Sequence, residues 1–214
     1  MSKLPLVFDI HKSPGTWPVR AAGCVLAGGR SRRMGTDKAL LELGGKTLVA
    51  IAVGRFRAFP EVMVSAADPD RYAFAGVRVV PDEKPGMGPL GGFLSALKAA
   101  GAPLVCFRPV DAPLVPAGLH MILAANAAAA NAAAVVPVFC GRPEPLLACL
   151  SKSALPALEE QVRAGILKAA HLFPLLDTVY LPLEAPELIS LFGNPEDWLV
   201  NANDPDTFSK LGKR

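Results

Sequence analysis

The sequence predicts an α/β protein with a mostly parallel sheet between two layers of helices. Two observations lead to this fold class. Short apolar runs rich in β-branched residues alternate with segments of helical length, the pattern of repeated strand–helix–strand units. The chain has 214 residues, of which 51% are hydrophobic, enough for one domain with a large core.

The elements follow in chain order after an N-terminal extension, residues 1–20, that carries three prolines. Residues 21–214 are expected to form the single domain, because no repeat or linker divides them. We predict strands at residues 22–27, 61–66, 77–80, 103–109 and 134–139, and helices at residues 47–59, 89–100 and 117–130.

The C-terminal third is less regular. The run EPLLACL, residues 144–150, predicts a further strand, and residues 153–165 predict a helix that Gly165 closes. Residues 175–183 predict another strand. Residues 201–212, NANDPDTFSKLG, indicate a turn that leads into a short helix.

Composition and charge exclude several classes of protein. A net charge of +3 is too small for a non-specific nucleic-acid binder, and no signal peptide is recognisable at the N-terminus. The charge-free run at residues 121–139 is dominated by alanine, so we expect a surface helix running into a strand and no membrane contact. The four cysteines have no metal-ligand spacing, so we expect reduced thiols in a cytoplasmic protein.

The stretch after the first strand is suited to holding an anion. Gly28 and Gly29 allow the backbone to turn and to present N–H groups to phosphate oxygens. Arg32, Arg33 and Lys38 add positive charge that matches a polyphosphate. A solvated basic loop has a similar composition, so that interpretation stays open.

Two known nucleotide-binding patterns do not fit. Five residues separate Gly29 from Gly35, and Thr36-Asp37 follow, so the loop is not a Walker A motif. Residues 86–91, GMGPLG, match the dinucleotide pattern but do not follow the first strand. We instead predict a glycine-proline loop at residues 85–92 that opens a helix whose N-terminus faces the ligand.

Two aspartates come directly after predicted strands. Asp111 follows an apolar strand and is flanked by prolines, a suitable place for a Mg²⁺ ligand opposite a phosphate loop. Asp82 ends another strand and could accept hydrogen bonds from a base. Each could instead close a turn or cap a helix, and this alternative stays open.

The segment LAGGRSRRMGTDKALLELGGKTL resembles the signature of the molybdenum cofactor guanylyltransferases, in which two glycines follow Leu-Ala. Four later segments resemble motifs of the same family, in the same order: PDEKPGMGPLGGFLSAL, RPVDAPLV, GRPEPLLACL and VNANDPDTF. Together they cover residues 22–211. The resemblance implies a Rossmann-like, nucleotide-diphospho-sugar transferase (glycosyltransferase-A-type) fold.

The resemblance also implies a function: transfer of GMP from GTP to the phosphate of molybdopterin, with Mg²⁺ as cofactor and pyrophosphate as leaving group. Arg32, Arg33, Lys38 and Asp111 would form the catalytic set, with Asp111 as metal ligand, and Asn201 and Asn203 would contact the pterin. The other residues expected to bind the nucleotide are Leu26, Ala27, Gly28, Gly29, Gly35, Asp82 and Gly88. Molybdenum-insertion proteins, recipient molybdoenzymes and their chaperones are the implied protein partners.

Departures from the family pattern leave alternatives open. Ser65 stands where the family has an asparagine, Glu144 where it has a glutamine, and Asp204-Pro205-Asp206 where it has Thr-Pro-Glu. A molybdopterin cytidylyltransferase or a related nucleotidyltransferase would share the chemistry. A non-catalytic protein that carries the finished cofactor is the alternative from another class.

Overall fold

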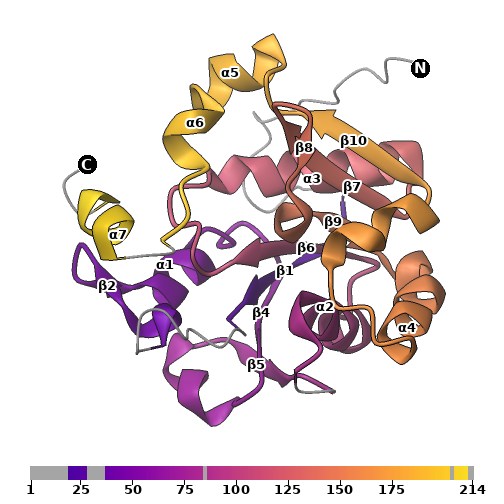
Figure 1. Cartoon of the computed structure of the whole chain (residues 1–214), viewed down its shortest axis with the longest axis horizontal. Helices are drawn as coiled ribbons and strands as arrows, with labels where there is room; N and C mark the ends of the chain where they lie inside the picture. The colour runs from indigo at the N-terminus through magenta and orange to yellow at the C-terminus, as the bar shows by residue number, and fades with distance from the viewer. Residues whose placement is uncertain (1–18, 28–36, 84–85, 203–204, 212–214) are drawn as a thin grey trace.

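A mostly parallel sheet forms the centre of the molecule (Figure 1). The computed structural model describes residues 19–27, 37–83, 86–202 and 205–211. Within these ranges eight strands form one sheet in the order β10-β7-β9-β6-β1-β4-β5, with β8 paired to β7. The strands are β1 (Ala21–Leu26), β4 (Glu61–Ala66), β5 (Arg78–Pro81), β6 (Leu104–Pro109), β7 (Ala134–Phe139), β8 (Arg142–Pro143), β9 (Cys149–Ser151) and β10 (Thr178–Pro182). A separate hairpin consists of β2 (Glu42–Leu43) and β3 (Lys46–Thr47).

Helices cover both faces of the sheet. The α-helices are α1 (Leu48–Gly54), α2 (Gly88–Ala99), α3 (Ala117–Ala130), α4 (Leu155–Arg163), α5 (Pro186–Phe192), α6 (Pro195–Trp198) and α7 (Pro205–Leu211). Short 3₁₀ turns connect several elements: η1 (Lys38–Leu40), η2 (Asp70–Ala75), η3 (Pro145–Leu147), η4 (Lys152–Ala154), η5 (Ala169–His171) and η6 (Phe173–Leu175). Among the described helices none is long and apolar enough to cross a membrane.

Alternating side chains of the strands supply two hydrophobic cores. In β1, Val25 packs in the core with α1 and α3, whereas Cys24 and Leu26 pack in the core with α2 and α4. Successive side chains of a strand point to opposite faces, so the two cores lie on opposite sides of the sheet. The three-layer architecture predicted from the sequence is therefore confirmed.

The strand order places a switch point beside β1. From β1 the chain continues to β4 and β5 on one side, then returns through α2 to β6 on the other side. Both neighbours are parallel to β1, so β1, β4 and β6 end at the same edge of the sheet. Ligands of open α/β sheets bind at such a point, outside the carboxyl ends of the strands.

Most predicted elements are confirmed, but some predictions were wrong. The helix expected at residues 47–59 ends at Gly54 and continues as turns, since glycine disfavours helix and Pro60 follows. The strand expected at residues 144–150 is instead η3 followed by β9. Pro145 has no N–H to donate to a strand ladder. Five short elements have no counterpart among the predicted ones: β2, β3, β8, α5 and α6.

Two arginine side chains hold the loop that follows β6. Arg108 is fully buried and donates hydrogen bonds to the carbonyl oxygens of Ala112 and Val115. Arg55, at the end of α1, donates to the carbonyl oxygen of Pro113 at 3.2 Å. The guanidinium groups thus satisfy carbonyls in a proline-rich loop that could not pair within a sheet.

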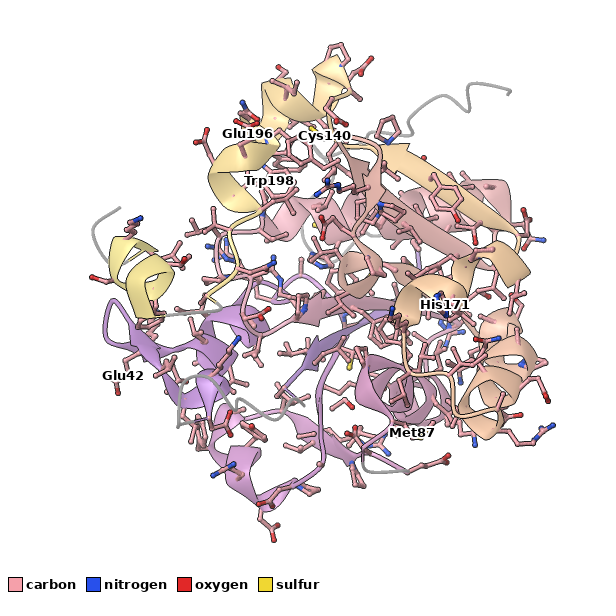
Figure 2. All side chains as sticks on the ribbon, viewed as in Figure 1. Glu42, Met87, Cys140, His171, Glu196 and Trp198 are labelled. Atoms are coloured by element: carbon pink, nitrogen blue, oxygen red, sulfur yellow. The ribbon has the colours of Figure 1, made fainter. Side chains whose placement is uncertain are left out.

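The cysteines carry free thiols. Cys24, Cys106 and Cys149 are buried, and Cys140 is exposed in the turn between β7 and β8 (Figure 2). Cys106 and Cys149 lie opposite each other in the antiparallel pairing of β6 with β9. Burial, together with the neighbouring Cys149, raises the pKa of the Cys106 thiol well above its usual value, so this thiol remains protonated.

Candidate active site

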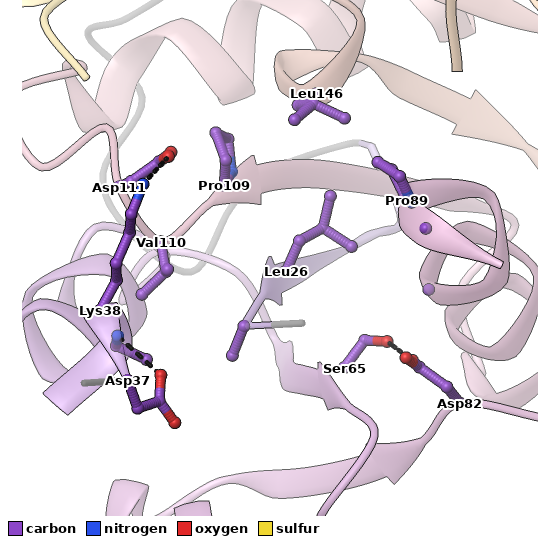
Figure 3. Close-up of a pocket in the computed structure, with 14 residues that line it drawn as sticks. Leu26, Asp37, Lys38, Ser65, Asp82, Pro89, Pro109, Val110, Asp111 and Leu146 are labelled. Carbon is purple, nitrogen blue, oxygen red and sulfur yellow. Dashed lines mark hydrogen bonds and ion pairs between the residues drawn. The ribbon is translucent and has the colours of Figure 1, made fainter. Parts of the chain in front are cut away.

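A cavity opens at the carboxyl ends of β1, β4, β5 and β6 (Figure 3). Its volume of about 170 Å³ is roughly ten times the ~15 Å³ that a cavity needs, on the same measure, to hold one water molecule. It therefore has room for part of an organic ligand. It is lined by Leu26, Ala27, Asp37, Lys38, Ala39, Ser65, Asp82, Gly88, Pro89, Gly92, Pro109, Val110, Asp111 and Leu146.

One side of the cavity carries a lysine and a carboxylate. The Nζ atom of Lys38, in η1, lies 3.7 Å from Oδ2 of Asp111, two residues after β6 (Figure 3). Burial raises the pKa of Asp111, and the nearby Lys38 partly counteracts this effect. A cation at Asp111 would further favour its charged form. This pair is suited to hold a polyphosphate together with a divalent cation.

The other side carries a serine and a second carboxylate. Ser65, at the end of β4, is buried and donates a hydrogen bond of 2.8 Å to Oδ1 of Asp82, which follows β5. Burial raises the pKa of Asp82, and the bond from Ser65 opposes the shift. Because Ser65 fixes one carboxylate oxygen, Asp82 has a defined orientation in the cavity wall (Figure 3).

The N-terminus of α2 forms a third part of the wall. Its capping residue, Met87, provides no side-chain hydrogen bond, and Pro89 lies in the first turn. Gly88 has a φ of 58°, a conformation that favours glycine. A Cβ at Gly92 would lie 2.9 Å from Leu26 Cδ2 and 3.0 Å from Ser65 Oγ, so any larger residue here would require these side chains to shift. The helix N-terminus favours a negatively charged ligand, as expected from the sequence.

Some backbone groups at the end of β1 already form hydrogen bonds within the protein. The N–H of Ala27 donates to the carbonyl oxygen of Ser65 at 3.0 Å, and the carbonyl oxygen of Leu26 accepts from the N–H of Val110 at 3.2 Å. These bonds fix the floor of the cavity. Backbone contact of Leu26 and Ala27 with a nucleotide stays a prediction.

Asp37 also lines the cavity, although it was not among the predicted site residues. Its carboxylate accepts hydrogen bonds from the N–H of Ala39 at 3.0 Å and from the hydroxyl of Tyr72 at 2.6 Å. It also pairs with Arg71 at 3.1 Å. Tyr72 and Arg71 were not detectable in sequence as partners, because each lies more than thirty residues away from Asp37 without any motif. Asp37 therefore links η1 to η2 through its hydrogen bonds and ion pair.

The structure brings six of the predicted site residues together in the cavity wall: Leu26, Ala27, Lys38, Asp82, Gly88 and Asp111. Gly28, Gly29, Arg32, Arg33, Gly35 and Asn203 lie outside the described residues. Asn201 is exposed and does not line the cavity, although the N–H of the adjacent Ala202 donates to the carbonyl oxygen of Asp111 at 2.7 Å. His171 and Cys140 are exposed (Figure 2), and neither lines the cavity.

The donors at Asp111 fit Mg²⁺ rather than a metal held by protein alone. In the described part of the chain, no group of three or more His, Cys, Asp or Glu side chains could hold a metal ion. Mg²⁺ is commonly bound by one or two carboxylates, with phosphates and water completing its octahedron. Asp111 supplies one such carboxylate at the edge of the cavity, so it would need a phosphorylated ligand to complete the site.

Comparisons with known proteins agree with this geometry. Residues 23–174 match the family model described as the MobA-like NTP transferase domain. The chain is 33% identical over 190 residues to a protein of Carboxydothermus hydrogenoformans named probable molybdenum cofactor guanylyltransferase, covering 88% of this chain and 93% of the relative. It is 40% identical over 185 residues to the molybdenum cofactor guanylyltransferase of Cereibacter sphaeroides, covering 79% and 93%.

A solved structure resembles the whole fold. Molybdopterin-guanine dinucleotide biosynthesis protein A from Archaeoglobus fulgidus superposes with a TM-score of 0.78 at 26% identity, covering 90% of this chain and 97% of that chain. The likeness confirms the expected nucleotide-diphospho-sugar transferase fold.

Proposed function

Because the chain belongs to the MobA-like NTP transferase family and is a nucleotidyltransferase, we propose that it transfers GMP from GTP to the phosphate of molybdopterin. One observation carries the proposal. The cavity places a lysine–carboxylate pair on one side and a hydrogen-bonded carboxylate on the other, so a nucleoside triphosphate can contact both.

The proposed reaction exchanges one phosphoanhydride for another. A phosphate oxygen of molybdopterin attacks the α-phosphorus of GTP, a new P–O bond forms, and the bond to the β-phosphate oxygen breaks. Pyrophosphate leaves with the bonding electrons. Because both nucleophile and leaving group are phosphates, the protein contributes mainly by positioning and by neutralising charge.

The lysine–carboxylate side would serve the phosphates. Lys38 would neutralise triphosphate oxygens as charge develops on the departing pyrophosphate. Asp111 would hold Mg²⁺, which when bound supplies positive charge to the phosphate oxygens. In the family pattern Arg32 and Arg33 would add to this charge, and their role stays a prediction.

The Ser65–Asp82 side would recognise the base. An ionised carboxylate only accepts hydrogen bonds, and guanine presents two adjacent donors, N1–H and the N2 amine. Cytosine presents its N4 amine beside the acceptor N3, which would face the carboxylate unfavourably. Ser65 occupies only one of about four acceptor sites on the Asp82 carboxylate, so the carboxylate can still accept both guanine donors and favours GTP over CTP.

The proposal is tested by measuring pyrophosphate release from GTP and from CTP, each with Mg²⁺, with and without molybdopterin. We expect release that requires both molybdopterin and Mg²⁺ and is faster with GTP. Faster turnover of CTP would assign the chain to the cytidylyltransferases. Binding of molybdopterin or its dinucleotide without release from either nucleotide would indicate a carrier.

The proposed function also implies a cellular location and protein partners. We expect the enzyme to work in the cytoplasm, which agrees with its four free cysteines. Molybdenum-insertion proteins, recipient molybdoenzymes and their chaperones stay expected partners.

A further inference from the structure

A buried tyrosine lies beneath the phosphate side of the cavity. Tyr72, in η2, is only 4% exposed, and its hydroxyl lies 2.6 Å from Oδ2 of Asp37 and 3.4 Å from the carbonyl oxygen of Ala27. A phenol has one proton to donate, and the shorter distance assigns it to Asp37. Burial and the Asp37 carboxylate raise the pKa of Tyr72, so the hydroxyl keeps this proton.

The hydroxyl lies where two separate parts of the cavity wall meet. Ala27 follows β1, and Asp37 precedes η1, so nine residues of sequence separate these two contacts of Tyr72. The segment between them carries the glycines and arginines of the expected phosphate loop. Tyr72 thus contacts both residues that flank this segment, from an element that the proposed function has not used.

Asp37 transmits this contact to Lys38. Its Oδ1 atom caps η1 by accepting from the N–H of Ala39, while its Oδ2 atom accepts from Tyr72 and pairs with Arg71. Lys38 is the first residue of η1 and extends to within 3.7 Å of Asp111. A shift of the Asp37 carboxylate would therefore move the start of η1 and the lysine with it.

We propose that Tyr72 is a positioning residue of the triphosphate site, which through Asp37 sets the position of Lys38 relative to the end of β1. The inference rests on the proposed function, since it assigns Lys38 to the triphosphate. Tyr72 itself touches no reacting atom. Its hydroxyl serves binding of the phosphates, and its ring fills the core beneath them.

A double-mutant cycle tests this coupling. Affinity for Mg²⁺–GTP is measured for the wild type, Tyr72→Phe, Lys38→Met and the double variant, together with the thermal unfolding of each. We expect Tyr72→Phe to weaken binding about tenfold, since a hydrogen bond to a charged group contributes roughly 1.5 kcal/mol or more. In the Lys38→Met background the same change should cost less than about twofold, because residues that act together are not additive.

A matched control is available in the second tyrosine of the chain. Tyr180 is exposed on β10, which lies at the far end of the sheet from β4 and β5, and Tyr180→Phe should leave GTP affinity unchanged. If Tyr72→Phe unfolds, Asp37→Asn replaces it in the cycle, because the amide weakens the bonds to Tyr72 and Arg71 and retains a capping oxygen.

The outcomes separate this inference from the proposed function. Equal losses on Tyr72→Phe in both backgrounds would show a general packing role and overturn the inference. If the protein binds CTP and not GTP, the same cycle can be measured with CTP. The coupling of Tyr72 to Lys38 is therefore tested even if the base assignment is wrong. A wild-type protein that binds neither triphosphate would overturn both.

Discussion

Replacement of Asp111 by alanine separates catalysis from folding. The side chain lies on the cavity wall, with its Oδ2 3.7 Å from Nζ of Lys38. Its backbone is held independently, because its carbonyl oxygen accepts from the N–H of Ala202, and Arg108 binds the carbonyls of the loop that follows. Asp111→Ala should therefore remove the carboxylate without moving the chain.

The expected magnitudes differ for the two properties. At an effective dielectric constant of about 20, charges about 4 Å apart attract each other by ~4 kcal/mol. Burial offsets this attraction in the folded protein, as the raised pKa of Asp111 indicates. We therefore expect the free energy of unfolding to change by less than about 1 kcal/mol. Loss of one electrostatic contact in the transition state typically costs about 10²–10³-fold in kcat.

Pyrophosphate release, measured as a function of Mg²⁺ concentration, provides the assay. The variant should show kcat at least about 10²-fold lower, with a higher Mg²⁺ requirement for the remaining activity. Asp177→Ala, which removes an exposed carboxylate outside the cavity, is the matched control and should retain wild-type rates. Turnover of Asp111→Ala near the wild-type rate, or an unchanged Mg²⁺ requirement, would refute the metal assignment.

Three further changes test other parts of the site. Burial raises the pKa of Asp82, so GTP affinity should be highest above that pKa and fall as the pH is lowered through it. The difference in GTP affinity between the wild type and Asp82→Asn, measured by titration, should therefore become smaller as the pH is lowered. A difference that stays constant with pH would contradict base recognition by the carboxylate. Gly92→Ala would place a Cβ against Leu26 and Ser65, which should lower the free energy of unfolding by about 1–3 kcal/mol and weaken GTP binding. Unchanged thermal unfolding would show that the cavity wall can shift to accommodate the methyl group. Arg108→Met leaves two carbonyls of the loop after β6 without their donor, so the free energy of unfolding, measured by chemical denaturation, should fall by about 2–4 kcal/mol. An unchanged free energy of unfolding would show that the loop does not depend on these hydrogen bonds.

The alternation of strands and helices was visible in the sequence because the central parallel strands bury both faces and are therefore mostly apolar. β1, for example, is buried along its whole length. Short elements carry no such pattern. The β2–β3 hairpin has two residues per strand, and β9 has three. Their positions depend on tertiary pairing, such as that of β9 between β6 and β7, which periodicity does not contain.

The site was predictable where its residues belong to a continuous motif. Lys38 and Asp111 belong to motifs that can be read along the chain, and they meet in the cavity as expected. Asp37 and Tyr72 were not predictable, because their bond joins residues 35 positions apart. Ser65 was noted only as a departure from the family pattern, and its hydrogen bond to Asp82 required the pairing of β4 with β5.

The positions of the four thiols allow unfolding to be followed by cysteine labelling. Cys140 is open to solvent, whereas Cys24, Cys106 and Cys149 are enclosed within the cores on the two faces of the sheet. An alkylating reagent should therefore label one cysteine at once and the other three only as the sheet opens. The number of labels per molecule, followed over time by mass spectrometry, would give the opening rate of the sheet without any engineered probe.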